Sequence, residues 1–209
     1  GPGTAAAGRL VAPDRQWQPD LYLRYAAYRE RPAHDLLAQV PDLPDDLARG
    51  LVVDLGCGPG FFSIDMAQMV GEQGQVFSVD LQEEMLSKVA YKSALKKLTG
   101  IIRPHQCTQK GIGLPDTIQA DFILAYYMVH ETLDHEAFLS EVKTILAPDG
   151  RLLIVEPPIH VSSEKFREIT RAALNAGFEI IDRPKGKGGK SLLLGIDRET
   201  IEAGTPAIN

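Results

Sequence analysis

The chain of 209 residues is 44% hydrophobic and 24% charged, which is the composition of an ordinary soluble globular protein with one α/β domain. Its formal net charge of -6 argues against a protein whose main task is to grip phosphate backbones. Two cysteines, Cys57 and Cys107, provide neither a disulfide framework nor a multi-cysteine zinc site. No apolar run is long enough to cross a bilayer and no secretory signal opens the chain, so we expect a cytoplasmic protein.

The chain divides into three parts. Residues 1–47 form a tail and a helical cover, because Trp17 to Val40 has helical spacing that is broken at Pro32. Residues 48–197 form the main domain, and residues 198–209 a flexible tail.

Short apolar runs in the main domain alternate with segments of helical period, as in repeated βα units. The predicted strands are 51–55, 75–80, 101–107, 121–129, 151–156, 178–182 and 190–196. The predicted helices are 61–70, 83 to just before Gly100, one capped by Asp134, and one that runs from Ser162 or Ser163 to Gly177. Pro148 to Gly150 is a predicted turn. Only "RPKGKGG" separates the last two strands, so they should be antiparallel neighbours.

A glycine turn follows the first strand in the stretch "VVDLGCGPGFF". A dinucleotide-binding fingerprint needs a third glycine where this chain has Phe61, so that fingerprint is absent. Asp54 at the strand end can accept hydrogen bonds from an ammonium group, and the glycines allow close approach of a ligand. S-adenosylmethionine carries an ammonium and a carboxylate beside an adenosine, and it matches this pattern.

Asp80 ends the second strand, at the spacing where an acidic residue binds the ribose hydroxyls of an adenosine cofactor. The alternative is that Asp80 only caps the following helix.

The segments "VVDLGCGPG", "VFSVD" and "ADFILAYYMVHETLDHEAFLSEVKTILAPDGRLLIVE", with the final strand pair, resemble the class I S-adenosylmethionine-dependent methyltransferases. The likeness extends over about residues 48 to 196 and is greatest to the group that includes the menaquinone and ubiquinone C-methyltransferases. It implies a Rossmann-like seven-stranded α/β sheet in the order 3-2-1-4-5-7-6, with strand 7 antiparallel and helices on both faces. The N-terminal segment is similar to the start of trans-aconitate methyltransferases, in which such a segment helps to cover the active site. Arg24, Arg29 and Arg31 there either face a carboxylate substrate or lie in solvent.

The resemblance also implies a set of cofactor-binding residues for S-adenosylmethionine. The glycine turn would hold the methionine part, Asp80 the ribose, and Leu81 the adenine. The family often has an acidic residue followed by a small one after strand 3, but this chain has Lys110 and Gly111, so a backbone carbonyl or Gln109 would replace the acid. The full predicted set is Asp54, Gly56, Cys57, Gly58, Gly60, Asp80, Leu81, Lys110, Gly111 and Ala125.

Two residues near the end of strand 4 are catalytic candidates. Tyr126 would border the methyl group, and because Tyr126 and Tyr127 alternate across the strand, only one of them can face the pocket. His130 can accept a proton from the acceptor with Glu131 orienting it, or it can fix the loop by hydrogen bonds. We favour the structural role, because methyl transfer depends mainly on in-line positioning.

The sequence therefore predicts an enzyme that methylates an O, S, N or activated C atom of a small molecule, without a metal and as a monomer or homodimer. The Asn/Asp-Pro-Pro-aromatic tetrad of amino-group methylation and the Pro-Cys of cytosine methylation are absent. RNA or protein methylation, with Lys185, Lys187 and Lys190 as contacts, is one alternative, although the acidic chain makes nucleic acid a poor partner. A non-catalytic module that binds S-adenosylmethionine is another.

Overall fold

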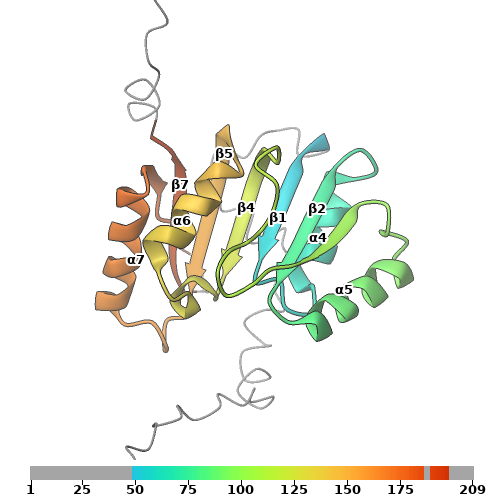
Figure 1. Ribbon diagram of the computed structural model, residues 1–209, viewed down its shortest axis with the longest axis horizontal. Helices are drawn as coiled ribbons and strands as arrows, with labels where there is room; N and C mark the ends of the chain where they lie inside the picture. Colours follow the sequence, from blue (N-terminus) through green and yellow to red (C-terminus); the bar gives the residue numbers. More distant parts are fainter. Residues whose placement is uncertain (1–48, 186–188, 198–209) are drawn as a thin grey trace, which may run out of the picture.

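The computed structural model describes residues 49–185 and 189–197, and these residues form one seven-stranded sheet with helices on both faces (Figure 1). The predicted N-terminal cover, the C-terminal tail and Lys187 lie outside the described residues. The strands are β1 (Leu51–Leu55), β2 (Gln75–Asp80), β3 (Ile102–Gln106), β4 (Ala120–Tyr126), β5 (Leu146–Glu156), β6 (Phe178–Asp182) and β7 (Lys190–Ile196). The helices are α4 (Phe61–Val70), α5 (Glu83–Leu95), η2 (Val129–Glu131), α6 (His135–Thr144) and α7 (Ser163–Asn175).

The strand order is β3-β2-β1-β4-β5-β7-β6. β1 pairs in parallel with both β2 and β4, while β7 pairs antiparallel with β5 and β6. The short connection between β6 and β7 permits only a hairpin, as the sequence predicted. The expected fold class and strand order are confirmed.

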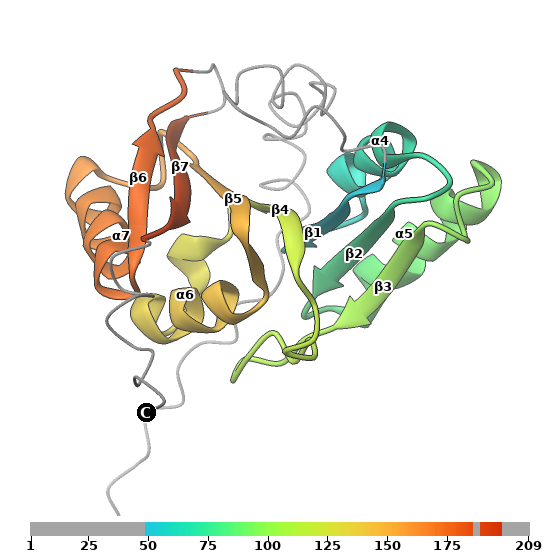
Figure 2. The ribbon, with the colours of Figure 1, turned by 90° about the horizontal axis from the view of Figure 1, so that it is seen from above.

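Two apolar clusters cover the two faces of the sheet, because side chains alternate along each buried strand. On β4, Phe122 and Leu124 join the cluster with α4 and α5, whereas Ile123 and Ala125 join the cluster with α6 and α7. Figure 2 shows α6 and α7 side by side beneath the β5 half of the sheet. The central strands β1 and β4 are therefore buried on both faces, which explains their nearly continuous apolar sequences.

Several predicted boundaries are wrong, among them the end of α5 and the start of β5. α5 ends at Leu95 and does not continue towards Gly100, because Lys97 adopts a left-handed conformation (φ 59°) and Leu98 N donates to Ser93 O at 2.8 Å. This arrangement closes the helix as a Schellman motif without a glycine. β5 begins at Leu146, so the predicted turn at residues 148–150 lies inside the strand, where the pairing with β4 is interrupted by a register shift.

Two predicted helix caps are present. The Asp134 carboxylate accepts a hydrogen bond from Ala137 N at 3.0 Å, and Ser162, rather than Ser163, accepts from Lys165 N at 3.1 Å. These side chains satisfy amide groups that have no partner inside their helices.

Replacing Asp134 by alanine should lower the free energy of unfolding by about 1 kcal/mol, because the first turn of α6 loses its acceptor. Urea denaturation monitored by circular dichroism measures the loss. Asp134→Ser is the control, since a serine oxygen can cap the same turn. An equal loss in both variants would contradict the capping role.

Candidate functional site

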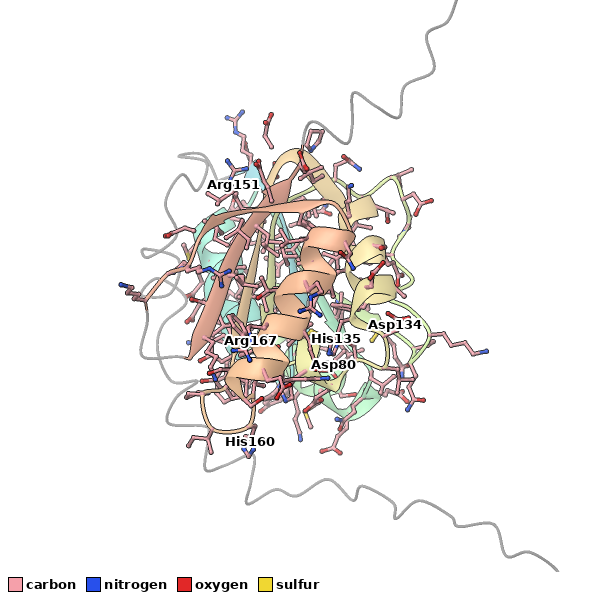
Figure 3. All side chains as sticks on the ribbon, turned by 90° about the vertical axis from the view of Figure 1, so that its left-hand side faces the viewer. Asp80, Asp134, His135, Arg151, His160 and Arg167 are labelled. Atoms are coloured by element: carbon pink, nitrogen blue, oxygen red, sulfur yellow. The ribbon has the colours of Figure 1, made fainter. Side chains whose placement is uncertain are left out.

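The predicted site residues gather at the carboxyl edge of the sheet, around β1, β2 and β4. The chain leaves β1 towards α4 on one face and leaves β4 towards η2 and α6 on the other. Open α/β sheets bind ligands at such a divergence of neighbouring strands. Figure 3 shows Asp80, His135 and His160 at this end of the molecule and Arg151 at the opposite end.

All three glycines of the turn have left-handed φ angles: 65° at Gly56, 52° at Gly58 and 80° at Gly60. A Cβ atom on Gly56 would lie 2.8 Å from Met128 Cβ, and one on Gly60 would lie 2.9 Å from Val89 Cγ2. The turn therefore requires glycine both for its backbone conformation and for its packing. It brings backbone amides to the edge of the sheet at the start of α4.

Asp54 is almost fully buried, with an exposed fraction of 1%. Its Oδ2 accepts a hydrogen bond from Ser63 Oγ on α4 at 2.5 Å, and Ser78 Oγ on β2 donates to Ser63 Oγ at 2.8 Å. This chain of polar groups joins β1, α4 and β2 beneath the glycine turn. Ser63 and Ser78 were not predicted as site residues, and their signal was a small hydroxyl residue between apolar neighbours of a helix or strand.

Asp80 joins the glycine turn to the residue before α5, whereas the N-cap of α5 is Gln82, so the predicted helix cap is not formed by Asp80 and ribose binding stays a prediction. Its Oδ1 accepts from Gln82 N at 2.9 Å, before α5, while Oδ2 accepts from Gly58 N at 2.8 Å. Each carboxylate oxygen has a further lone pair, so the group can also accept from a ligand hydroxyl. Leu81 beside it is 44% exposed.

Lys110 and Gly111 lie on a turn in which Thr108 and Gly111 bridge each other. Glu141 on α6 supports the neighbouring segment, because its Oε1 accepts from Gly113 N at 2.9 Å. A side chain at Gly111 would collide with the same carboxylate. Glu141 is thus an acidic side chain beside residues 111–113 that the sequence did not indicate.

Cys57 lies inside the glycine turn, where its backbone N donates to Val79 O at 3.0 Å and ties the turn to β2. Burial, together with the negative charges of Asp54 and Asp80, raises the pKa of the Cys57 thiol. Burial also raises the pKa of Cys107. Both sulfurs are therefore neutral thiols, which are poor nucleophiles and poor metal ligands. Within residues 49–185 and 189–197, no three His, Cys, Asp or Glu side chains are placed to hold a metal ion.

The alternation argument for Tyr126 and Tyr127 is wrong. β4 ends at Tyr126 rather than at Val129, and Tyr127 has a left-handed φ of 60°, so the backbone turns where the alternation would have continued. The two rings stack with centroids 4.1 Å apart, and Tyr126 also lies 4.6 Å from Phe62. Both tyrosines thus pack in the same apolar cluster. Ala125 is buried on the opposite face.

His130 lies on η2, where its ring is bound by a residue that the sequence analysis did not select. Its Nδ1 lies 2.5 Å from Glu156 Oε2, whereas Glu131, the predicted partner, is 3.9 Å from Nε2. Burial by itself lowers the pKa of His130, but the hydrogen bond and charge of Glu156, with a smaller contribution from Glu131, raise it overall. Glu156 ends β5 beside β4, and an acidic residue at the end of an apolar run was the available signal.

Comparison with known proteins shows to which family the chain belongs. The family model described as "Methyltransferase domain" matches residues 48–191. The chain belongs to this family.

Two kinds of enzyme name occur among the similar curated proteins. Trans-aconitate 2-methyltransferase of Delftia acidovorans is 36% identical over 68% of this chain and 49% of its own length. The enzyme of the same name from Methylobacterium radiotolerans is 32% identical over 77% of this chain and 56% of its own length. Ubiquinone/menaquinone biosynthesis C-methyltransferase of Francisella tularensis is 32% identical over 59% of this chain and 50% of its own length. The chain spans about half the length, or less, of the curated relatives that it matches.

Solved structures confirm the fold of the methyltransferase domain. A SAM-dependent methyltransferase from Aquifex aeolicus is 23% identical, with a TM-score of 0.68 over 86% of this chain and 97% of that chain. S-adenosylmethionine, often written SAM, is the cofactor that this family indicates. No helix among the described residues is both long enough and apolar enough to span a membrane.

Proposed function

We propose that the protein transfers a methyl group from S-adenosylmethionine to a small-molecule acceptor. The observation that carries the proposal is the pair of hydrogen bonds by which Asp80 joins the glycine turn to the start of α5. This pair brings an acceptor for ribose hydroxyls and the amides of the turn to one edge of the sheet. The names of the curated relatives support a small-molecule acceptor.

The described residues fit the groups of the cofactor, which supplies an electrophilic methyl group when it is bound. Asp80 would accept from the ribose hydroxyls, and Leu81 offers an exposed apolar surface for the adenine. The amides of the glycine turn would bind the methionine carboxylate. Asp54, which is engaged with Ser63, would support the turn and attract the ammonium through its charge. The edge formed by these groups would hold the sulfonium in line with the acceptor.

Lys110 and Gly111 would contact the adenine through their backbone, since Glu141 holds the neighbouring Gly113 by a hydrogen bond. Ala125 and Tyr126 would define the distance between the sheet and the methyl group. The monomeric or dimeric state and the cytoplasmic location stay predictions from the sequence.

RNA or protein methylation receives less support. Lys190 was one of three lysines expected to contact such a substrate, but it is half-buried and its Nζ donates to Val161 O at 2.5 Å. This ammonium is committed to the loop after β5.

Titration calorimetry with S-adenosylmethionine tests the proposed function, and we expect saturable binding with one site per chain. A methyltransferase releases S-adenosylhomocysteine, so binding of that product should also be measurable. The absence of heat with both ligands would overturn the proposal. Binding without transfer to any acceptor would favour the non-catalytic module.

A further inference from the structure

A single carboxylate at the end of β5 binds His130 at two points. The Nδ1 atom of the ring lies 2.5 Å from Glu156 Oε2, and the backbone N of His130 donates to Oε1 at 3.2 Å. An ionised carboxylate accepts hydrogen bonds and cannot donate one, so Nδ1 carries the hydrogen in this pair. Two bonds to one residue fix both the position of the backbone and the plane of the imidazole.

The side chain of Glu156 is completely buried. A buried charge loses its hydration, so this carboxylate needs a partner inside the protein. Gly189, just before β7, packs against the backbone of the same residue, since a Cβ there would collide with the Glu156 carbonyl oxygen. Lys190, the register partner of Glu156, directs its ammonium to Val161 O instead. Among the described residues, the imidazole of His130 is therefore the side chain that is paired with this carboxylate.

The other nitrogen of the ring is available for chemistry. With Nδ1–H donated to Glu156, the lone pair of the neutral ring is on Nε2. The charged groups that act on the ring are Glu156 on β5, Glu131 on η2 and Lys165 on α7. The Glu131 carboxylate is 3.9 Å from Nε2, beyond hydrogen-bonding distance, and 20% of the His130 side chain is exposed.

We propose that Glu156 is a positioning residue that holds His130 as a general base, and that the methyl acceptor is a neutral hydroxyl or thiol. The proposal rests on the proposed function. The acceptor proton moves to Nε2 while the acceptor atom forms a bond to the methyl carbon. The electrons of the broken carbon–sulfur bond stay on sulfur, which becomes a neutral thioether. Glu156 balances the charge of the resulting imidazolium.

Charge at the rim favours this acceptor class. A carboxylate acceptor is already ionised at neutral pH and needs no base. It would also approach the negative charges of Glu156 and Glu131 within the described part of the site. A neutral hydroxyl or thiol meets neither obstacle and gains reactivity when its proton is removed.

Nuclear magnetic resonance of the full chain tests the pair without requiring methyl transfer. With nitrogen-labelled histidine, the wild-type ring of His130 should show the Nδ1–H tautomer and a pKa above the ordinary value of 6.5. In Glu156→Gln the pKa should fall, because the charge is lost while the shape is kept. The matched control Glu131→Gln should change it less. An Nε2–H tautomer in the wild type would overturn the pair even if the Gln variant did not fold.

Kinetics with three probes tests the acceptor class: catechol, thiophenol and the anion trans-aconitate. We expect transfer to a neutral probe, with a rate that rises with pH through the pKa of His130. Glu156→Gln should lower kcat by about 100-fold and move this rise to lower pH, while the KM and Kd for S-adenosylmethionine stay unchanged. Transfer to trans-aconitate alone, or to none of the probes, would overturn the acceptor class. If the wild-type protein does not bind S-adenosylmethionine at all, the proposed function itself is refuted.

Discussion

Replacing Asp80 by alanine will weaken the binding of S-adenosylmethionine by about 100-fold. Each hydrogen bond to a charged group contributes about 1.5–3 kcal/mol, and two ribose hydroxyls are expected to bind this carboxylate. Loss of about 3 kcal/mol corresponds to two factors of ten in Kd. The variant also loses the acceptor of Gly58 N, so the glycine turn is less well fixed before the ligand arrives. Titration calorimetry measures the change in Kd.

Two further variants make this result specific. Asp80→Asn keeps the shape but presents the NH2 group of its side-chain amide, a donor, to one of the two backbone N–H donors, so its loss of affinity should be intermediate. Glu179→Ala removes an exposed carboxylate from β6, the edge strand at the other end of the sheet, and should bind normally. An unchanged Kd in Asp80→Ala would mean that the ribose assignment is wrong.

Replacing Leu124 by alanine will lower the free energy of unfolding by about 3 kcal/mol, within the range of 2–5 for buried leucines. Leu124 has no exposed surface and lies at the centre of β4, between β1 and β5. Strands on both sides limit collapse around the cavity, so much of the lost packing stays uncompensated. Urea denaturation at constant pH gives the difference.

Leu133→Ala is the matched control, since the same atoms are removed from a leucine that is 88% exposed. Its unfolding free energy should change by no more than about 0.5 kcal/mol. Equal losses in the two variants would show that burial in the sheet is not what makes Leu124 important.

The fold was largely predictable because the signals that determine it are local. The apolar run of β1, the acidic N-cap at Asp134 and the short connection between β6 and β7 each specify a structure from a few neighbouring residues. The turn after β1 was equally predictable from its glycines, because left-handed φ angles and close packing both favour glycine.

The candidate site was only partly predictable, because its side chains meet across long stretches of sequence. His130 and Glu156 are 26 residues apart, and the place of Glu156 at the end of an apolar run does not reveal that it would bind His130 in preference to Glu131, the next residue in the chain. The pairing of Ser63 with Asp54 depends on how α4 lies against β1. Tyr127 misled the alternation argument because a left-handed residue other than glycine has no reliable sequence signal.

The division of the sheet between β1 and β4 has an evolutionary consequence. Asp54, the glycine turn and Asp80 come from the first half of the chain segment, whereas His130 and Glu156 come from the second half. The two halves meet at the β1–β4 pairing, with Asp54 in register with Leu124. If the proposed roles hold, mutation or recombination in the second half can alter the choice of acceptor while the residues that bind the methyl donor are inherited unchanged.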